Sequence, residues 1–243
     1  MSTELPLVGD YSAPTAELSG ARIGVAVFPG TLGDRDVTRA LTLAGATPVS
    51  LWYEDTDLSN VDAVILPGGA SYGDYMRPGA LAAQAPLVKA IVAAAEAGTP
   101  ILGTGNGFHV LTEAGILPGV LGLNESARYH VTAQPVKVES TKTAFTGDYT
   151  EGEELVLPLK SKYGNYFVDA ATASELESSG RVVLRYVSNP NGSVNDIAGV
   201  ANAAGNVVGL LPQVEYAVEN GFGPSVDGAK VFTSILRTLA GGK

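Results

Sequence analysis

The residues that could do chemistry gather at a break between two elements in the stretch PILGTGNGFHVLTEAGILPG, residues 100–119. A short apolar run is typical of a buried strand, a glycine-rich turn follows it, and apolar residues then recur at helical spacing. Hydrolytic α/β enzymes hold a nucleophile on such a turn, where N–H groups at the start of the helix can stabilise an oxyanion. The residue at the tip is Gly105, which has no side chain to attack a substrate.

Neighbouring side chains do not replace this nucleophile. Thr104 carries a hydroxyl, but it stands one residue before the tip, where we expect it to point into the sheet with no base beside it. We expect His109, on the helix, to be a hydrogen-bonded or partly exposed residue rather than a catalytic one. His130 starts a predicted strand and has no evident partner. Since a side chain at the tip would be strained, Gly105 relieves the strain and removes the chemistry together.

The composition narrows the class of protein. The chain has 243 residues, 45% of them hydrophobic, and a formal net charge of −10. This is enough apolar material for a sizeable core, and the charge argues against nucleic acid or an anionic membrane as partner. With no cysteine and only two histidines, the sequence excludes thiol nucleophiles and disulfides. We therefore expect no metal site and no other cofactor, and, since the chain begins without a secretory signal, a cytoplasmic protein.

Strands and helices alternate in the first half of the chain. The predicted strands are residues 22–28, 47–52, 62–69 and 100–103, and the predicted helices between them are residues 34–46 and 85–98. This alternation predicts an α/β fold, with a flavodoxin-like, doubly wound, mostly parallel sheet and helices on both faces. Ligands bind such sheets beyond the carboxyl ends of the strands, where three glycine-rich turns occur.

The second half predicts an antiparallel extension of that sheet. We expect strands at 131–140, 153–160, 181–187, 197–202 and 206–212, a short helix at 169–180 and a closing helix at 225–240. Residues 1–20 are predicted to be a flexible N-terminal extension, and residues 21–243 a single domain.

The chain resembles a known family in five ordered segments. These are FPGTLGDRDVTRAL, LPGGASYGDYMRPGALA, GNGFHVLTEAGILPG, NPNGSVNDIAGVANAAGNVVGLLP and SVDGAKVF. They are similar to segments of the glutaminase subunit of phosphoribosylformylglycinamidine synthase, a PurQ-type class I glutamine amidotransferase. The resemblance extends from about Ile23 to about Arg237 and implies a class I glutamine amidotransferase-like fold in a ligase complex of purine biosynthesis.

The resemblance also implies that the catalytic triad is incomplete. In the family a cysteine attacks glutamine, a histidine is its base and a glutamate orients the histidine. These positions correspond here to Gly105, Gln213 and Glu215, so only the glutamate is kept. A neutral amide such as that of Gln213 does not titrate near neutral pH and cannot act as the base. At the rim of the pocket, where the family has a histidine and an acidic residue, the segment reads Lys160, Ser161, Lys162 and Tyr163.

The resemblance also implies that other parts of the family's machinery are kept in this chain. The oxyanion donors correspond to Gly68, Gly69 and the backbone N–H of Asn106, so the resemblance implies a pocket that still accepts a small carboxamide ligand or a carboxylate. It also implies a face that meets a large synthetase subunit, which in the family activates formylglycinamide ribonucleotide with ATP and receives ammonia. The candidate residues of that face are Asp34, Arg35, Asp74, Arg77, Asn189 and Asn191. Two of them also have structural uses, since Asp34 can cap a helix and Asn191 can form a turn with Gly192.

The interpretation that follows is a catalytically inactive, glutaminase-like pseudoenzyme that binds or stabilises a synthetase partner. We expect no glutaminase activity from this chain. One alternative is a repurposed enzyme with different chemistry in the same pocket, using Tyr163, Lys162 or His109. The other is a sensor that binds glutamine or a related amino acid without turnover.

Overall fold

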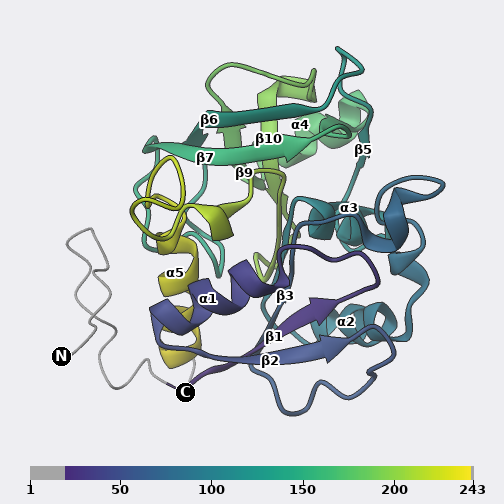
Figure 1. Cartoon of the computed structure of the whole chain (residues 1–243). Coiled ribbons are helices and arrows are strands. Elements are labelled where there is room, and N and C mark those ends of the chain that lie inside the picture. Colours follow the sequence, from purple (N-terminus) through teal and green to yellow (C-terminus); the bar gives the residue numbers. More distant parts are fainter. Residues whose placement is uncertain (1–19, 242–243) are drawn as a thin grey trace.

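Strands from both halves of the chain form one nine-stranded sheet in the computed structural model, which describes residues 20–241 (Figure 1). The predicted N-terminal extension, residues 1–20, lies outside the described residues except for Gly20. The strand order is β2-β1-β3-β4-β11-β10-β9-β6-β7. These strands are β1 (Arg22–Val27), β2 (Thr47–Trp52), β3 (Ala63–Leu66), β4 (Ile101–Thr104), β6 (His130–Val138), β7 (Glu154–Ser161), β9 (Val182–Tyr186), β10 (Ile197–Ala201) and β11 (Val207–Leu210).

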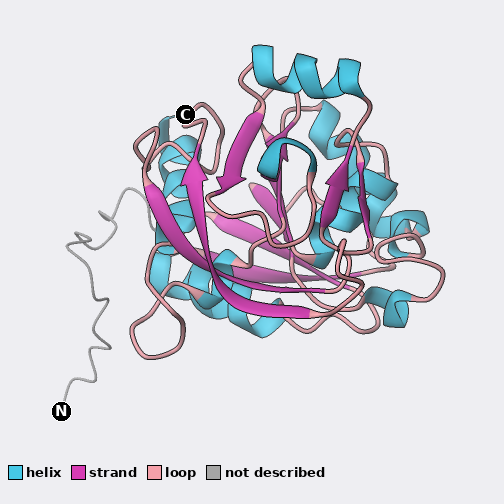
Figure 2. Ribbon diagram, turned by 90° about the horizontal axis from the view of Figure 1, so that it is seen from above, coloured by secondary structure: helices cyan, strands magenta, loops and turns pink. Residues whose placement is uncertain are grey.

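Helices cover both faces of the parallel part of the sheet. Helices α1 and α5 pack together on one side of β1 and β3, and α2 and α3 lie on the other side (Figure 1). Figure 2 shows the strands grouped in the centre with helices around them. The helices are α1 (Asp34–Ala44), α2 (Pro86–Glu96), α3 (Asn106–Glu113), α4 (Ala170–Ser178) and α5 (Ala229–Gly241), with short 3-10 turns η1 (Ser71–Asp74), η2 (Ala82–Gln84), η3 (Val194–Asp196) and η4 (Val214–Tyr216).

The first half of the chain confirms the α/β prediction. Strands β2, β1, β3, β4 and β11 pair in parallel, and every residue of β3, β4 and β11 is buried. Burial on both faces explains why these strands are continuous apolar runs rather than alternating ones. The carboxyl ends of β1, β3 and β4 meet at one edge of the sheet, so the glycine-rich turns that follow them are brought together.

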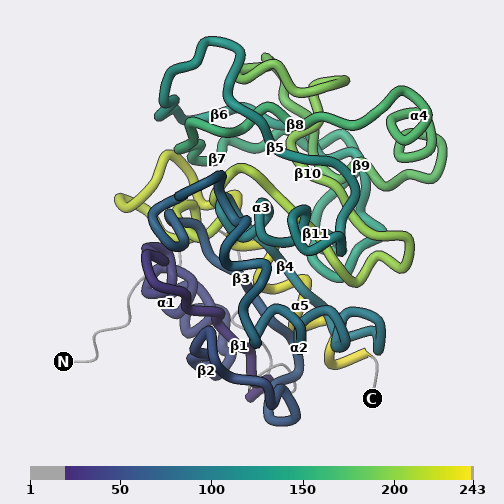
Figure 3. The backbone as a smooth tube through the Cα atoms, turned by 90° about the vertical axis from the view of Figure 1, so that its right-hand side faces the viewer, coloured from purple at the N-terminus to yellow at the C-terminus, as the bar shows by residue number. Residues whose placement is uncertain are grey.

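The second half extends the sheet with antiparallel strands, as predicted. Next to β11 in the sheet lie β10, β9, β6 and β7, in that order, and each pairs antiparallel with its neighbour. These four strands form the upper part of the molecule in Figure 3. A separate two-stranded sheet, which the sequence did not predict, joins β5 (Val120–Gly122) and β8 (Asn165–Phe167). Among residues 20–241, no helix is both long and apolar enough to span a bilayer.

The closing helix begins later than the sequence predicts. It starts at Ala229 rather than at Ser225, because the preceding segment is bound to β7. The Ser225 hydroxyl donates to the carbonyl of Val156 at 2.6 Å, and Asp227 accepts from the N–H of Val156 at 2.7 Å. These two bonds hold the segment in a turn, so that the helical hydrogen-bond ladder starts only after it.

Candidate functional site

The turn between β4 and α3 has the strained geometry that the sequence predicts. Gly105 adopts φ 51° and ψ −111°, a conformation that side chains with a Cβ rarely adopt. Its N–H donates to the carbonyl of Leu210 at 2.9 Å, and its own carbonyl accepts from the N–H of Phe108. The helix that follows lies close to β3, since a Cβ on Gly107 would stand 1.9 Å from the carbonyl oxygen of Leu66. The elbow is therefore intact although its tip carries no side chain.

Gln213 occupies the space beside that tip. A Cβ placed on Gly105 would lie 2.8 Å from Nε2 of Gln213 and 3.3 Å from its Cγ. A Cβ on Gly68 would lie 2.4 Å from the same Nε2. Gln213 is only 6% exposed, and its side-chain amide makes no hydrogen bond with any described residue. The two residues that the resemblance assigns to the nucleophile and the base therefore lie side by side, and Gly105 has no side chain while Gln213 ends in a neutral amide.

Glu215 is buried behind the tip, next to Thr104. The Thr104 hydroxyl donates to Oε1 of Glu215 at 3.1 Å, so the expectation that no base lies beside this hydroxyl is wrong. Burial raises the pKa of Glu215 to about 7, while hydrogen bonds from Thr104 and from the N–H of Gly68, and the charge of Lys160, act in the opposite direction. Thr104 is 1% exposed and is not part of the cavity described below, so its hydroxyl does not reach a ligand there.

The predicted oxyanion donors are divided between the cavity and the interior. Gly69 and Asn106 line the cavity. Gly68 does not line it, and its N–H bonds to the buried Glu215 carboxyl. Asn106 is the first residue of α3, so its N–H has no acceptor within the helix. Its side chain donates to Asp74 at 3.1 Å and accepts from the N–H of Ser71 at 3.4 Å. One helix-start donor therefore remains available beside Gly105.

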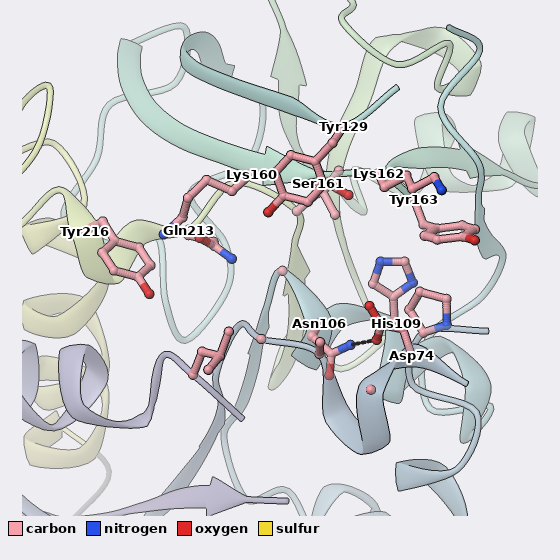
Figure 4. A pocket seen from close by; sticks show the side chains of 17 residues that line it. Asp74, Asn106, His109, Tyr129, Lys160, Ser161, Lys162, Tyr163, Gln213 and Tyr216 are labelled. Atoms are coloured by element: carbon pink, nitrogen blue, oxygen red, sulfur yellow. Dashed lines mark hydrogen bonds between the residues drawn. The ribbon is translucent and has the colours of Figure 1, made fainter. Parts of the chain in front are cut away.

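A cavity of about 440 Å³ lies above the elbow (Figure 4). All four predicted rim residues line it: Lys160, Ser161, Lys162 and Tyr163. The sequence did not single out two further lining residues, Tyr129 and Tyr216. The sequence offered one signal for Tyr216, because it directly follows Glu215, and no signal for Tyr129.

Two groups in the cavity have shifted ionisation. Burial lowers the pKa of Lys160, whose Nζ lies 3.3 Å from the centre of the Tyr216 ring, while the charges of Glu215 and Asp36 act in the opposite direction. Burial raises the pKa of Asp74, and the hydrogen bond from Asn106 acts against that change. No group of three or more His, Cys, Asp or Glu residues within 20–241 could hold a metal ion.

The two histidines lie in different surroundings. His109 lines the cavity, but burial lowers its pKa to about 4, so the ring is neutral near pH 7, and it bonds to the backbone of Tyr163. His130 lies outside the cavity lining and has a partner that the sequence did not predict, since its ring lies 2.8 Å from the Ser126 hydroxyl. Among the described residues, neither ring forms a hydrogen bond with Thr104, Gln213 or Glu215.

The structure separates the six residues assigned to a partner surface. Arg35 is exposed and forms no ion pair with a described carboxylate. Arg77 is 67% exposed in its side chain, but it makes a two-pronged bond with Glu113, at 2.6 Å on each side. Asp34 lies inside the first turn of α1, whose N-cap is Gly33, so the predicted capping role of Asp34 is wrong.

The other members of that set bond within the chain. Asp74 is on the wall of the cavity. Asn189 donates to the carbonyl of Ser193 at 2.8 Å. Asn191 is 1% exposed, donates to the Tyr186 hydroxyl at 3.2 Å and accepts from the Ser193 hydroxyl at 2.8 Å. The side chain of Asn191 is therefore inaccessible to a partner in this structure and holds its loop in place.

Comparisons with known proteins find relatives along almost the whole chain. Residues 20–234 match the family described as the CobB/CobQ-like glutamine amidotransferase domain. The chain is 54% identical over 219 residues to the phosphoribosylformylglycinamidine synthase subunit PurQ of Corynebacterium jeikeium, covering 90% of this chain and 98% of that protein. It is 52% identical over 221 residues to the subunit of the same name from Streptomyces coelicolor, again covering 90% and 98%.

Solved structures agree with these relatives. A chain from the structure of PurLQS of Thermotoga maritima superposes with a TM-score of 0.84 at 42% identity, covering 90% of this chain and 99% of that one. A glutamine amidotransferase from the same organism, at 15% identity and a TM-score of 0.52 over 82% and 77% of the two chains, shares the fold alone.

Proposed function

We propose that this chain, which belongs to the CobB/CobQ-like glutamine amidotransferase family, is a PurQ-like subunit of a phosphoribosylformylglycinamidine synthase. We propose further that the subunit itself does not hydrolyse glutamine. The family membership rests on the match over residues 20–234 and on relatives more than half identical to the chain. The proposal of inactivity is supported by one observation: Gly105 and Gln213, which the resemblance assigns to the nucleophile and its base, lie so close that a Cβ on Gly105 would stand 2.8 Å from Nε2 of Gln213.

Glutamine hydrolysis by the family's route needs three events at this elbow. A nucleophile must attack the amide carbon, a base must take the nucleophile's proton, and an acid must protonate the departing ammonia. Gly105 supplies no nucleophile, and the amide of Gln213 neither accepts nor releases a proton near pH 7. Glu215 has a suitable pKa of about 7 but is 2% exposed and does not line the cavity. The tip of the elbow therefore has no group for the first event.

The proposed role is assembly with a synthetase. A chain of the Thermotoga maritima PurLQS structure, whose name joins three subunits, resembles this chain over 90% of its length. We propose that this protein occupies the corresponding place beside a PurL-like large subunit and that the complex draws ammonia from solution. Arg35 is the predicted interface residue that fits this role best, because it is exposed and carries a charge that no described carboxylate neutralises.

Co-elution with a PurL-like large subunit tests the proposal. The large subunit of the Corynebacterium jeikeium synthase, together with any further subunit of that synthase, is a suitable probe. The PurQ subunit of the same organism is 54% identical to this chain. We expect Arg35→Glu to weaken co-elution and Lys89→Glu, an exposed charge reversal on α2, to leave it unchanged. A desolvated interfacial arginine contributes about 2–4 kcal/mol on truncation, which is a large change in co-elution.

The pocket provides a second control for assembly. Lys160→Ala changes the cavity but not the exposed surface around Arg35, so we expect this variant to co-elute like the parent. Loss of co-elution in Lys160→Ala, with Arg35→Glu still bound and both variants folded by circular dichroism, would contradict the assignment of the interface. A parent chain that never co-elutes would contradict the proposed role itself.

A further inference from the structure

We propose that the cavity above Gly105 binds the carboxylate end of a small acid in preference to the corresponding carboxamide. The inference rests on the proposed loss of glutaminase chemistry and names the ligand that the remaining pocket fits. We define the floor of the cavity as Gly105, Asn106 and Gln213. The inference depends on three groups of hydrogen-bond donors or cations on or near this floor.

The first donor is the side chain of Gln213. It is 94% buried and lines the cavity, and its amide bonds to no described residue. Nε2 is the amide atom that lies beside Gly105, and in Figure 4 this nitrogen points into the cavity. The carbonyl oxygen Oε1 has almost no exposed surface. Because Nε2 faces the cavity and bonds to no described residue, it is free to donate to a ligand atom that accepts a hydrogen bond.

The second donor is the start of α3. The N–H of Asn106 has no acceptor within the helix, and the partial positive charge of the helix N-terminus lies at the same place. The Asn106 side chain is fixed by Asp74 and by the N–H of Ser71, so the backbone N–H is held in position next to Gly105. Helix starts of this kind favour an anion.

The third set is the pair of lysines at the rim. In a chain whose formal net charge is −10, Lys160 and Lys162 both line this cavity, and neither forms an ion pair with a described carboxylate. The amine of Lys160 is partly buried against the Tyr216 ring. Partly buried cations usually have a partner, because burial without one is unfavourable. Among the described residues, Asp74 is the one carboxylate that lines the cavity, and Asn106 already donates to it.

The floor discriminates between an acid and its amide. A carboxylate offers acceptors only, and it matches Nε2 of Gln213, the N–H of Asn106 and the amine of Lys160. A carboxamide places an NH₂ group among these donors. Asp74 is the carboxylate that lines the cavity and it already accepts from Asn106, whereas Oε1 of Gln213 is covered and Glu215 does not line the cavity. A buried amide donor without an acceptor weakens binding, so the carboxylate is preferred.

L-glutamate and L-glutamine provide a matched pair of probes, because they differ only in this end group. We would titrate each into the full chain, without any partner, by isothermal calorimetry near neutral pH. The structure predicts that glutamate binds at least about tenfold more tightly than glutamine. Glutamate binding should weaken more steeply than glutamine binding as salt is raised, because glutamate carries one more negative charge.

Two variants locate the binding. Lys160→Ala and Gln213→Leu should each weaken glutamate binding by about tenfold, since each removes one donor to the carboxylate. Lys89→Ala, on the exposed face of α2 and outside the cavity lining, should leave it unchanged. Equal affinity for the two probes, tighter binding of glutamine, or no heat from either probe up to about 10 mM would each overturn the inference. None of these results bears on co-elution with the synthetase, so failure here is distinct from failure of the proposed function.

Discussion

Substitution of Gly105 by cysteine restores the type of residue that the family uses as its nucleophile, and we expect it to destabilise the chain without giving turnover. The φ of 51° at this position is strained for any residue with a Cβ, and such strain contributes about 1–3 kcal/mol of destabilisation. The new Cβ would also lie 2.8 Å from Nε2 of Gln213, so the glutamine side chain must move. For a chain of this length, 1 kcal/mol corresponds to about 2–4 °C in Tm, so the expected fall is about 2–12 °C.

Thermal melts and an ammonia assay measure the two parts of this prediction. Gly98→Ala is the control for backbone strain alone, because Gly98 has φ 91° and nothing lies within 4 Å of an added Cβ. Gly105→Ala should lower Tm by more than Gly98→Ala does, and Gly105→Cys should release no ammonia from glutamine because no imidazole activates the thiol. An unchanged or raised Tm in Gly105→Cys, or recovered turnover, would refute the reasoning about the elbow.

Two further predictions concern buried polar groups. Burial raises the pKa of Glu215 to about 7 from 4.5, so the stability that the protonated form gives is present below pH 4.5 and is lost as the pH rises through 7. The glutamine in the Glu215→Gln variant cannot ionise, so the free energy of unfolding of this variant relative to the parent should increase between about pH 5 and about pH 8, by up to about 3 kcal/mol. A difference in urea melts that does not change with pH would contradict the burial of this carboxyl. Asn191→Ala should lower the free energy of unfolding by about 1–3 kcal/mol, because it removes the hydrogen bond to the buried Tyr186 hydroxyl and one of the bonds of the Ser193 hydroxyl. The folded Asn191 variant should still co-elute with the synthetase, and loss of co-elution at full stability would instead make Asn191 an interface residue.

Local patterns in the sequence were sufficient for most of the fold. Continuous apolar runs gave β1, β3 and β4, and alternation with helical segments gave the parallel sheet. The glycine at the tip of the elbow predicted a positive φ, and Gly105 has one. Helix ends were less predictable: α5 begins at Ala229 because Ser225 and Asp227 bond to a distant strand, which local sequence does not reveal.

The contacts of the site could not be predicted, because they depend on the order of the strands. Strand β11 pairs with β4, with Leu210 opposite Thr104, and this register brings the segment after β11 next to the elbow. Thr104 and Glu215 thus meet although 111 positions separate them. The same register places the side chain of Gln213 over Gly105. The resemblance assigned Gly105, Gln213 and Glu215 to the triad positions, but it did not predict that a Cβ on Gly105 would meet the side chain of Gln213.

Ammonia release from L-glutamine, measured on the full chain alone and in the presence of the synthetase large subunit, tests the central claim most directly. The chain should release no more ammonia than a blank without protein in either case, because the elbow has no nucleophile and Gln213 is no base. The claim would be contradicted by release above the blank that falls when Thr104 is changed to valine or His109 to alanine. Such a result would show that one of these side chains has taken over the reaction.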